Sequence, residues 1–202
     1  MNKKLCSFFI SFLIVILITK VVSAGGIKGK VNLEGTKSND GVLIYIEHID
    51  SIFTPLKKPA LMDQKNFMFI PKILPILAGT TVNFLNSDSV LHNVFTPSKC
   101  AGSFNLGTWP RGQSRSYTFY NAGCFATILC EVHPYMQAWI AVLQNPFFTQ
   151  ANQTGEYEIK NIPPGSYKLK VWYPFYETKT LQITVEDTQT IVKNFILKRT
   201  GE

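Results

Sequence analysis

Apolar and polar positions alternate over short stretches of this chain, and no window shows a long apolar period of 3.6 residues. Segments 79–85, 116–119 and 167–171 each place every second side chain on one face, as half-buried strands do. Further strands are expected at 42–46, 67–70, 124–130, 138–143, 157–159, 181–185 and 191–197. Turn signals such as Pro163-Pro164-Gly165 separate them. Many short strands and few helices predict an all-β protein built of sandwiches or barrels.

The first 24 residues have a different composition from the rest of the chain. Lys3 and Lys4 precede an uncharged apolar run that ends at Thr19, and small residues follow at Val22-Ser23-Ala24. This is the composition of a secretory signal, and the run is shorter than the about 20 residues of a membrane-spanning helix. We expect residues 1–24 to be cleaved, which leaves an exported, periplasmic protein with no membrane span. A retained anchor is the alternative.

Charge and motifs in the sequence indicate neither a nucleic-acid-binding protein nor an enzyme. The net charge of +7 falls to +4 once the three lysines of the leader are removed, and no block of like charges remains. The sequence shows no carboxylate pair, no nucleophile with a nearby base and no phosphate-binding loop. We therefore expect no nucleic-acid partner and no catalytic activity.

Three cysteines follow the leader, namely Cys100, Cys124 and Cys130. Export places them in an oxidising compartment, but an odd count leaves at least one outside any internal disulfide. A Cys100–Cys124 disulfide is the natural pairing in an exported protein, and it would leave Cys130 for another role. Two free thiols are the alternative.

Cys130, His133 and Met136 occur at spacings of three, and His92 lies upstream at the start of a short apolar strand. A one-electron copper site uses a thiolate and two imidazoles in a plane, with a weak thioether on the axis. Each of the four could instead be an ordinary core residue. Zinc is a poorer interpretation because a thioether is a poor ligand for it, and a haem is not indicated because the Cys-x-x-Cys-His motif is absent.

The order of these residues carries a family resemblance. The pattern Asn86-x-Asp88-x-x-x-His92-Asn93-Val94, followed by Gly123-x-Phe125-x-x-x-x-Cys130-x-x-His133-x-x-Met136, resembles the cupredoxins, the type 1 blue copper proteins. The likeness covers about residues 60–143. The short His-to-Met gap is most similar to that of amicyanin, of the methylamine-utilisation kind, because plastocyanin has a longer gap. The resemblance implies a Greek-key β-barrel or sandwich that holds one type 1 copper ion.

The resemblance also implies roles for single residues. The implied ligands are His92, Cys130 and His133 in the equatorial plane and Met136 on the axis. Asn93 would brace the ligand loop by hydrogen bonding. Pro134 and Tyr135 would surround the exposed edge of His133, where a redox partner docks. By contrast, His48 and the three tryptophans are expected to serve only surface or packing roles.

The last fifty residues resemble a second family. The phrase Thr154-Gly155-x-Tyr157-x-Ile159-x-Asn161-Ile162-Pro163-Pro164-Gly165-x-Tyr167 is similar to the carboxypeptidase regulatory-like β-sandwich, which is related in shape to transthyretin. The opening phrase that such domains carry occurs instead at 26–46. We therefore predict a discontinuous sandwich, made of 25–50 and 146–199, with a cupredoxin domain inserted at 51–145. The alternative is that 25–50 adds strands to the copper barrel.

The resulting functional expectation is a periplasmic electron-transfer protein. Its copper would cycle between Cu(I) and Cu(II), taking an electron from one redox protein and passing it to another. The alternatives are a periplasmic copper transport or storage protein that docks through its sandwich, and a structural adhesion module with an incidental metal.

Overall fold

The computed structural model describes residues 24–201, and its regular structure is β-strand with one short 3₁₀ turn, Lys99–Ala101. The strands are β1 (Gly25–Leu33), β2 (Leu43–Ile46), β3 (Ala60–Lys65), β4 (Met68–Ile70), β5 (Ile73–Leu77), β6 (Thr80–Asn86), β7 (His92–Thr96), β8 (Phe104–Trp109), β9 (Ser114–Phe119), β10 (Phe125–Leu129), β11 (Gln137–Leu143), β12 (Phe148–Gln150), β13 (Glu156–Ile162), β14 (Gly165–Trp172), β15 (Lys179–Val185), β16 (Thr190–Val192) and β17 (Phe195–Leu197). The all-β prediction is confirmed. Among the described residues no helix is long or apolar enough to cross a membrane. The expected signal segment lies outside them, except for Ala24.

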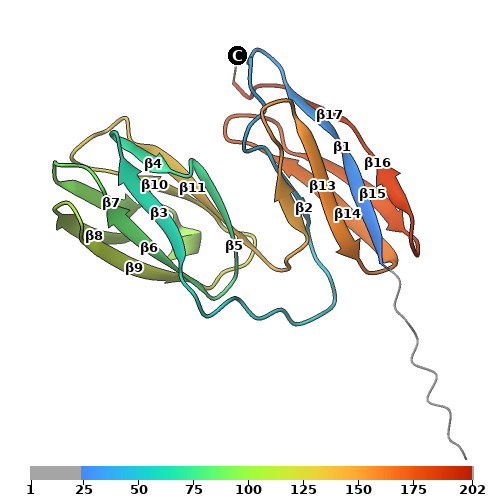
Figure 1. The fold of residues 1–202 in the computed structure, drawn as a ribbon, viewed down its shortest axis with the longest axis horizontal. Helices are drawn as coiled ribbons and strands as arrows, with labels where there is room; N and C mark the ends of the chain where they lie inside the picture. Colours follow the sequence, from blue (N-terminus) through green and yellow to red (C-terminus); the bar gives the residue numbers. More distant parts are fainter. Residues whose placement is uncertain (1–23, 202) are drawn as a thin grey trace, which may run out of the picture.

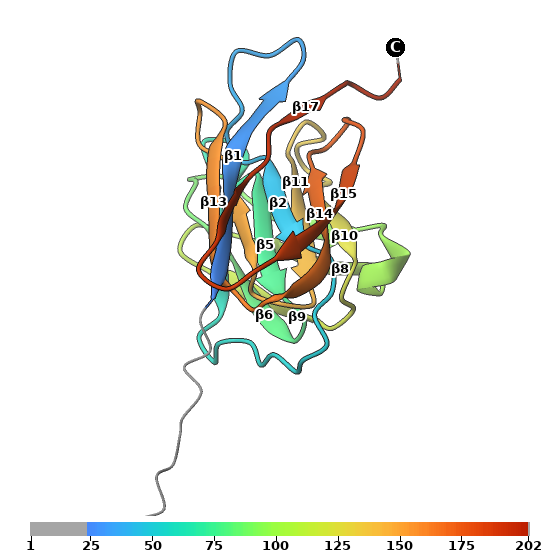
Figure 2. The ribbon, with the colours of Figure 1, turned by 90° about the vertical axis from the view of Figure 1, so that its right-hand side faces the viewer.

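The strands form two β units that lie side by side (Figure 1). Strands β3 to β11 make the middle unit, with sheets ordered β5-β11-β10-β7-β8 and β4-β3-β6-β9. Strands β1, β2 and β12 to β17 make the outer sandwich, with sheets β13-β1-β16 and β12-β2-β14-β15, while β17 also pairs with β1. Figure 2 views the molecule with the outer sandwich in front of the middle unit.

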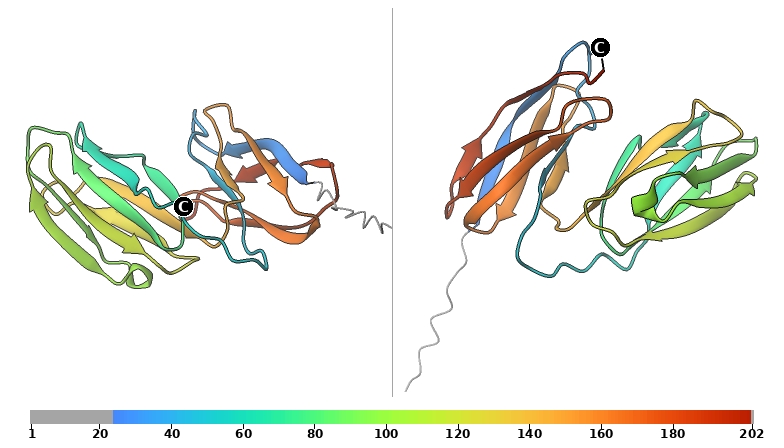
Figure 3. Two further views of the ribbon diagram at one scale, coloured as in Figure 1. Left: turned by 60° about the horizontal axis from the view of Figure 1, so that its bottom comes forward. Right: turned by 180° about the vertical axis from the view of Figure 1, so that it is seen from behind.

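The two units have separate apolar cores. Val31 and Ile44, from the first two strands, share a core with Ile183 and have Tyr167 packed against them. The core of the middle unit is a different cluster, which includes Phe84 and Ile140. On this topology we propose that the outer sandwich is one discontinuous domain, residues 25–50 and 146–199, with residues 51–145 inserted into it. Figure 3 shows the connections that lead into and out of the middle unit running between the two.

Strand β11 is buried on both faces because it lies between the two units. Ile140 belongs to the core of the middle unit, whereas Ala141 and Leu143 face the sandwich. The apolar contact between the units is made by Leu43, Tyr45, Ala141 and Leu143, with Phe125, Phe148 and Trp172 packed against them. A strand covered on both faces appears in the sequence as a continuous apolar run rather than an alternating one, as 138–143 does.

One predicted strand is broken in the structure. The run 191–197 forms β16 and β17, which both pair with β1 but are interrupted at Lys193 and Asn194. At the break the Lys193 N–H donates to the carbonyl of Lys28 over 2.9 Å, and Asn194 Oδ1 accepts the N–H of Lys30 over 2.8 Å. A side chain at Gly29 would lie 1.7 Å from the Lys193 carbonyl oxygen. The close approach of Lys193 to β1 therefore depends on glycine at position 29.

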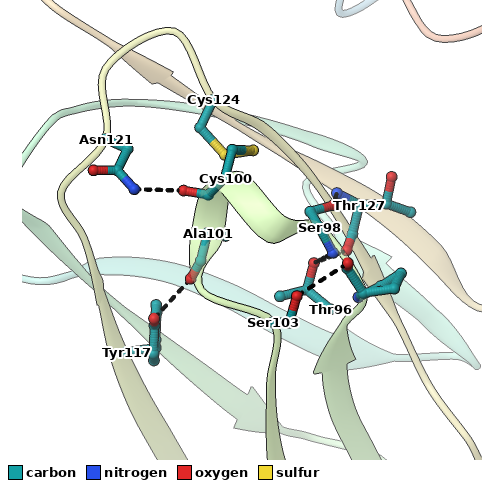
Figure 4. The surroundings of a disulfide bond; sticks show 10 residues. Thr96, Ser98, Cys100, Ala101, Ser103, Tyr117, Asn121, Cys124 and Thr127 are labelled. Carbon is teal, nitrogen blue, oxygen red and sulfur yellow. Dashed lines mark hydrogen bonds between the residues drawn. A yellow bond between two sulfur atoms is a disulfide. The ribbon is translucent and has the colours of Figure 1, made fainter.

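A disulfide joins Cys100 and Cys124, with the sulfur atoms 2.11 Å apart (Figure 4). Cys130 is a free, buried thiol. The bond ties the 3₁₀ turn to the residue just before β10. Around it, Asn121 Nδ2 donates to the Cys100 carbonyl over 2.6 Å, and the Tyr117 hydroxyl donates to the Ala101 carbonyl over 2.7 Å. The strand that leads to Cys130 is therefore fixed at its start.

Candidate metal centre

Two segments of the middle unit bring the predicted ligands together at one end of it. His92 is the first residue of β7, and Cys130 directly follows β10. His133 and Met136 lie in the loop between β10 and β11. In Figure 1 this loop is at the end of the middle unit away from the connection that leads in from β2. Because strand backbones fix His92 and Cys130, the loop has to position only the other two residues.

Three of these side chains converge. The Nδ1 atoms of His92 and His133 are 3.0 Å apart, and His133 Nδ1 lies 3.9 Å from Cys130 Sγ. One ligand atom from each residue can be chosen so that all three lie within 4.8 Å of one another. His92 is fully buried and Cys130 is 2% exposed, whereas His133 is partly exposed. His133 therefore gives the cluster a route to solvent.

Met136 is buried beneath the same loop. Its side chain is 1% exposed and belongs to the core cluster that contains Cys130. Its backbone N–H donates to the His133 carbonyl over 2.9 Å, which closes the loop into a tight turn. The short His-to-Met spacing thus folds back on itself and points Met136 inward.

Asn93 connects the two ligand-bearing segments. Its backbone N–H points at Cys130 Sγ over 3.4 Å, and its side-chain oxygen accepts the N–H of Glu131 over 3.3 Å. Its side-chain nitrogen donates to Asn105 Oδ1 over 2.8 Å and to the Gly107 carbonyl over 2.9 Å. Asn93 therefore ties β7 both to the cysteine and to the loop that follows it.

Asp88 is a residue of the site to which the sequence analysis gave no role, although it lies in the quoted pattern. His92 Nε2–H donates to Asp88 Oδ2 over 2.8 Å. Burial alone would raise the pKa of Asp88, but hydrogen bonds from Phe67, His92 and Asn66 outweigh it and hold the pKa below the usual value. The signal available in the sequence was a carboxylate four residues before a candidate ligand histidine.

Phe67 is a second residue that sequence reasoning missed. Its ring lies edge-on to both imidazoles, with centroids 5.0 Å from His133 and 5.9 Å from His92. It comes from the turn between β3 and β4, far from the ligands in sequence. Only the pairing of distant strands brings it to the site, so no local pattern could have indicated it.

Pro134 and Tyr135 are exposed, Tyr135 by 71%, and the Tyr135 ring lies 6.1 Å from that of His133. Exposed apolar side chains also occur in the neighbouring β3–β4 and β6–β7 turns and in the ligand loop, namely Phe67, Met68, Val90, Leu91 and Val132. His48 is exposed on the outer sandwich and takes no part in the cluster.

The donor set fits a soft, redox-active metal. Because His92 Nε2 carries the proton donated to Asp88, neutral His92 has its lone pair on Nδ1, which faces His133 Nδ1. A buried thiol, two imidazole nitrogens and a buried thioether are the ligand types of mononuclear copper electron-transfer sites. His92, Cys130, His133 and Met136 would hold the ion.

A model of the carboxypeptidase regulatory-like domain family matches residues 134–198. The match begins within the ligand loop and includes β11, whose hydrogen-bonded neighbours are β10 and β5 of the middle unit. The matched segment also contains β12 to β17. No curated protein matches the chain.

Several solved structures resemble part of the chain. A reduced mutant of amicyanin is 23% identical, covering 44% of this chain and 91% of its own, with a TM-score of 0.40. A purple cupredoxin from Nitrosopumilus maritimus is 24% identical over 41% of this chain and 98% of its own, with a TM-score of 0.37. A copper-containing nitrite reductase from Thermus scotoductus is 25% identical over 50% of this chain and 25% of its own, with a TM-score of 0.41. These TM-scores are low, so the function is inferred below from the side chains of the site.

Proposed function

We propose that the middle unit is a type 1 copper centre and that the chain is an exported one-electron carrier between two redox proteins. The observation that carries this proposal is the convergence of His92, His133 and the buried Cys130, which offer one ligand atom each within 4.8 Å of one another. When bound, copper supplies the Cu(II)/Cu(I) couple. In this proposal His92, Cys130, His133 and Met136 would hold the ion, with a thiolate, two imidazoles and a thioether as its ligand groups.

The surroundings of the ligands suit electron transfer because they are built to move little. His92 is fixed by Asp88, and Cys130 by its place at the end of β10. Asn93 joins β7 to the ligand loop through the Glu131 N–H. A frame that holds the same ligand positions in both oxidation states keeps the reorganisation energy of electron transfer small.

His133 is the proposed exit for electrons. It is the one imidazole of the cluster that is partly exposed, since His92 is fully buried. The exposed Pro134 and Tyr135 flank it in sequence. A small apolar face of this kind suits the brief encounters of redox proteins, whose interfaces are at the low end of the size range. The partners are proposed only as a donor and an acceptor of single electrons.

The outer sandwich is proposed to serve as a scaffold or docking module, and an exported location is proposed from the signal-like composition of residues 1–24. The Cys100–Cys124 disulfide supports that location because such bonds persist in oxidising compartments. The burial of His92 and Cys130 favours a retained ion over one that is handed on, since transport needs an accessible, labile site.

An optical titration of the chain without its leader tests the proposal. Adding Cu(II) should produce an intense visible band from thiolate-to-copper charge transfer, bleached by a reductant and restored by an oxidant. Cys130→Ser should abolish the band. The double variant Cys100→Ser/Cys124→Ser is the matched control and should keep it.

Other outcomes separate the alternatives. A colourless protein that retains Cu(I) would favour transport or storage, and one that retains no copper would favour a structural module. A visible band that persists in Cys130→Ser would show that the ligands are assigned wrongly.

A further inference from the structure

Asp88 is the meeting point of three separate segments of the middle unit. It lies in the polar turn between β6 and β7, and its side chain is 12% exposed. Its Oδ1 accepts the N–H of Asn66 over 2.7 Å, and its Oδ2 accepts the N–H of Phe67 over 2.9 Å and Nε2–H of His92 over 2.8 Å. One carboxylate thus binds the candidate ligand and the β3–β4 turn.

The turn that Asp88 binds has an unusual sequence for its shape. Lys65 pairs with Met68, so Asn66 and Phe67 form a two-residue hairpin turn. Their φ angles are 54° and 57°, and both are positive. A type I′ turn needs positive φ at both central residues and strongly prefers glycine at the second. A phenylalanine in this conformation is a genuine outlier and strains the backbone.

The strained backbone conformation of Phe67 places its ring against the candidate ligands. The ring stands edge-on to His133, at an interplanar angle of 80°, and to His92, at 88°. Glycine in the second turn position would leave both imidazoles without this neighbour. A local strain that persists because surrounding groups fix it is a known mark of functional sites.

The third hydrogen bond sets the chemistry of His92. An ionised carboxylate can only accept, so the hydrogen between Asp88 Oδ2 and His92 Nε2 belongs to the imidazole. The lone pair then lies on Nδ1, which faces His133 Nδ1 at 3.0 Å. A carboxylate behind a ligand histidine fixes its tautomer and ring orientation and raises its basicity.

We propose that Asp88 is a positioning residue that joins the Phe67 turn to the first ligand, so that the β3–β4 hairpin is a working part of the metal centre. Asp88 selects the ligating tautomer of His92, and through the two turn N–H groups it holds Phe67 against both imidazoles. This proposal rests on the copper function above, but its structural half concerns the copper-free protein and is tested there.

The first experiment uses the metal-free chain with ¹⁵N-labelled histidine. The ¹⁵N shifts should show His92 as the Nε2–H tautomer. Asp88→Asn should shift the equilibrium between the two tautomers or broaden the His92 signals. Asp50→Asn, an exposed change of the same charge on the outer sandwich, should leave it unaltered. A wild-type Nδ1–H tautomer would overturn the proposal, whatever the optical spectrum shows.

The second experiment measures copper affinity by competition with a chelator. Asp88→Asn should weaken Cu(II) binding by about 10–100-fold, as outer-sphere variants do, and should raise the reduction potential because a less basic imidazole stabilises Cu(II) less. Asp50→Asn should bind as the wild type does. Unchanged affinity and potential in Asp88→Asn would overturn the positioning role.

Phe67→Gly removes the ring that lies against the imidazoles and leaves the hydrogen bonds of Asp88 in place. Glycine relieves the positive φ, so the melting temperature of the metal-free protein should rise, while the His92 tautomer should stay unchanged. Removal of copper by the chelator should become severalfold faster because the ring no longer covers the imidazoles. An unchanged removal rate would overturn the role given to Phe67. If wild-type protein binds no copper, the copper function fails, and the tautomer measurement still decides whether Asp88 positions His92.

Discussion

The middle unit and the outer sandwich are built from the same kind of strand but treat polar side chains differently. The buried polar residues of the middle unit are Gln64, Thr80, Asn86, His92, Asn93 and Thr96. In the described part of the outer sandwich, no Asn, Gln, His, Ser, Thr or charged side chain is buried. Asn145 lies at the junction of the two units. Burying a polar group costs free energy unless it is hydrogen-bonded. The sandwich buries mainly tyrosine hydroxyls, such as that of Tyr157, which donates to the Lys193 carbonyl over 2.6 Å, whereas the middle unit buries His92 and Asn93 at the site itself.

Asn86, one of these buried polar side chains, is linked to the site. Asn86 Nδ2 donates to the carbonyls of Val90 and Trp109 over 2.8 and 2.9 Å, and its oxygen accepts the N–H of Asp88 over 2.9 Å. Asn86 therefore shapes the turn that presents Asp88 to His92. The comparison teaches that within one all-β chain, a buried hydrogen-bonded path from Asn86 through Asp88 to His92 distinguishes the unit with a site from the unit that is mainly packed.

The largest expected effect comes from truncating one core at a time. Phe84→Ala should destabilise the middle unit by about 3–5 kcal/mol, and Ile44→Ala the outer sandwich by about 2–5 kcal/mol, because each side chain is fully buried. Calorimetry should show each variant lowering a different unfolding transition. If both variants lower both transitions equally, the two units unfold as one and the contrast between them is structural only.

Removing the Cys100–Cys124 disulfide is a change confined to the middle unit. Replacing Cys100 and Cys124 by serine removes a cross-link across 24 residues and should cost about 2–4 kcal/mol. Urea unfolding should show the loss in the transition that Phe84→Ala also affects. A loss in the other transition would mean that the 3₁₀ turn stabilises the sandwich, contrary to the separate cores.

Much of the fold could be predicted because alternation is a local signal. The strand at Thr80–Asn86 buries every second residue, and the sequence predicted it to within one residue at each end. The ligand types were also readable, since Cys130, His133 and Met136 are close in sequence. Strand β5 was missed because Pro75 argues against a strand, yet it pairs in parallel at the edge of its sheet.

The rest of the site could not be predicted because it depends on strand register. Phe67 reaches His133 only because Lys65 pairs with Met68 and β3 runs beside β6. Asp88 was visible as a carboxylate near His92, but its bonds to Asn66 and Phe67 cross twenty residues or more. Sequence patterns report the face on which a residue lies, not which distant turn comes to rest against it.

A smaller effect is expected at the contact between the units. The Trp172 ring of the sandwich lies 4.6 Å from that of Phe125 in the middle unit. Trp172→Ala should remove about 0.5–1.5 kcal/mol of pair energy beyond its buried area and loosen the units relative to each other. Small-angle scattering should show a broader distribution of shapes, while the copper band stays unchanged. A changed band would mean that the sandwich helps to shape the metal centre.

The smallest effect is a pH dependence confined to the sandwich. Glu47 follows β2 and pairs with Lys170 and Lys168 of β14. The hydrogen bond from Lys170 lowers the pKa of Glu47, with attraction to both lysines adding to it and slight burial opposing it. Because the folded pKa lies below the unfolded one, the stabilisation is present above the ordinary carboxyl range and is lost as the pH falls through the folded pKa. The Glu47 side chain is 37% exposed, so solvent screening limits the contribution to about 0.2–1 kcal/mol.

Urea unfolding of Glu47→Gln at pH 7 and at about pH 3 should show a smaller loss of sandwich stability on acidification than wild type, with the middle unit unaffected. Equal losses in variant and wild type would place the acid sensitivity of the sandwich elsewhere.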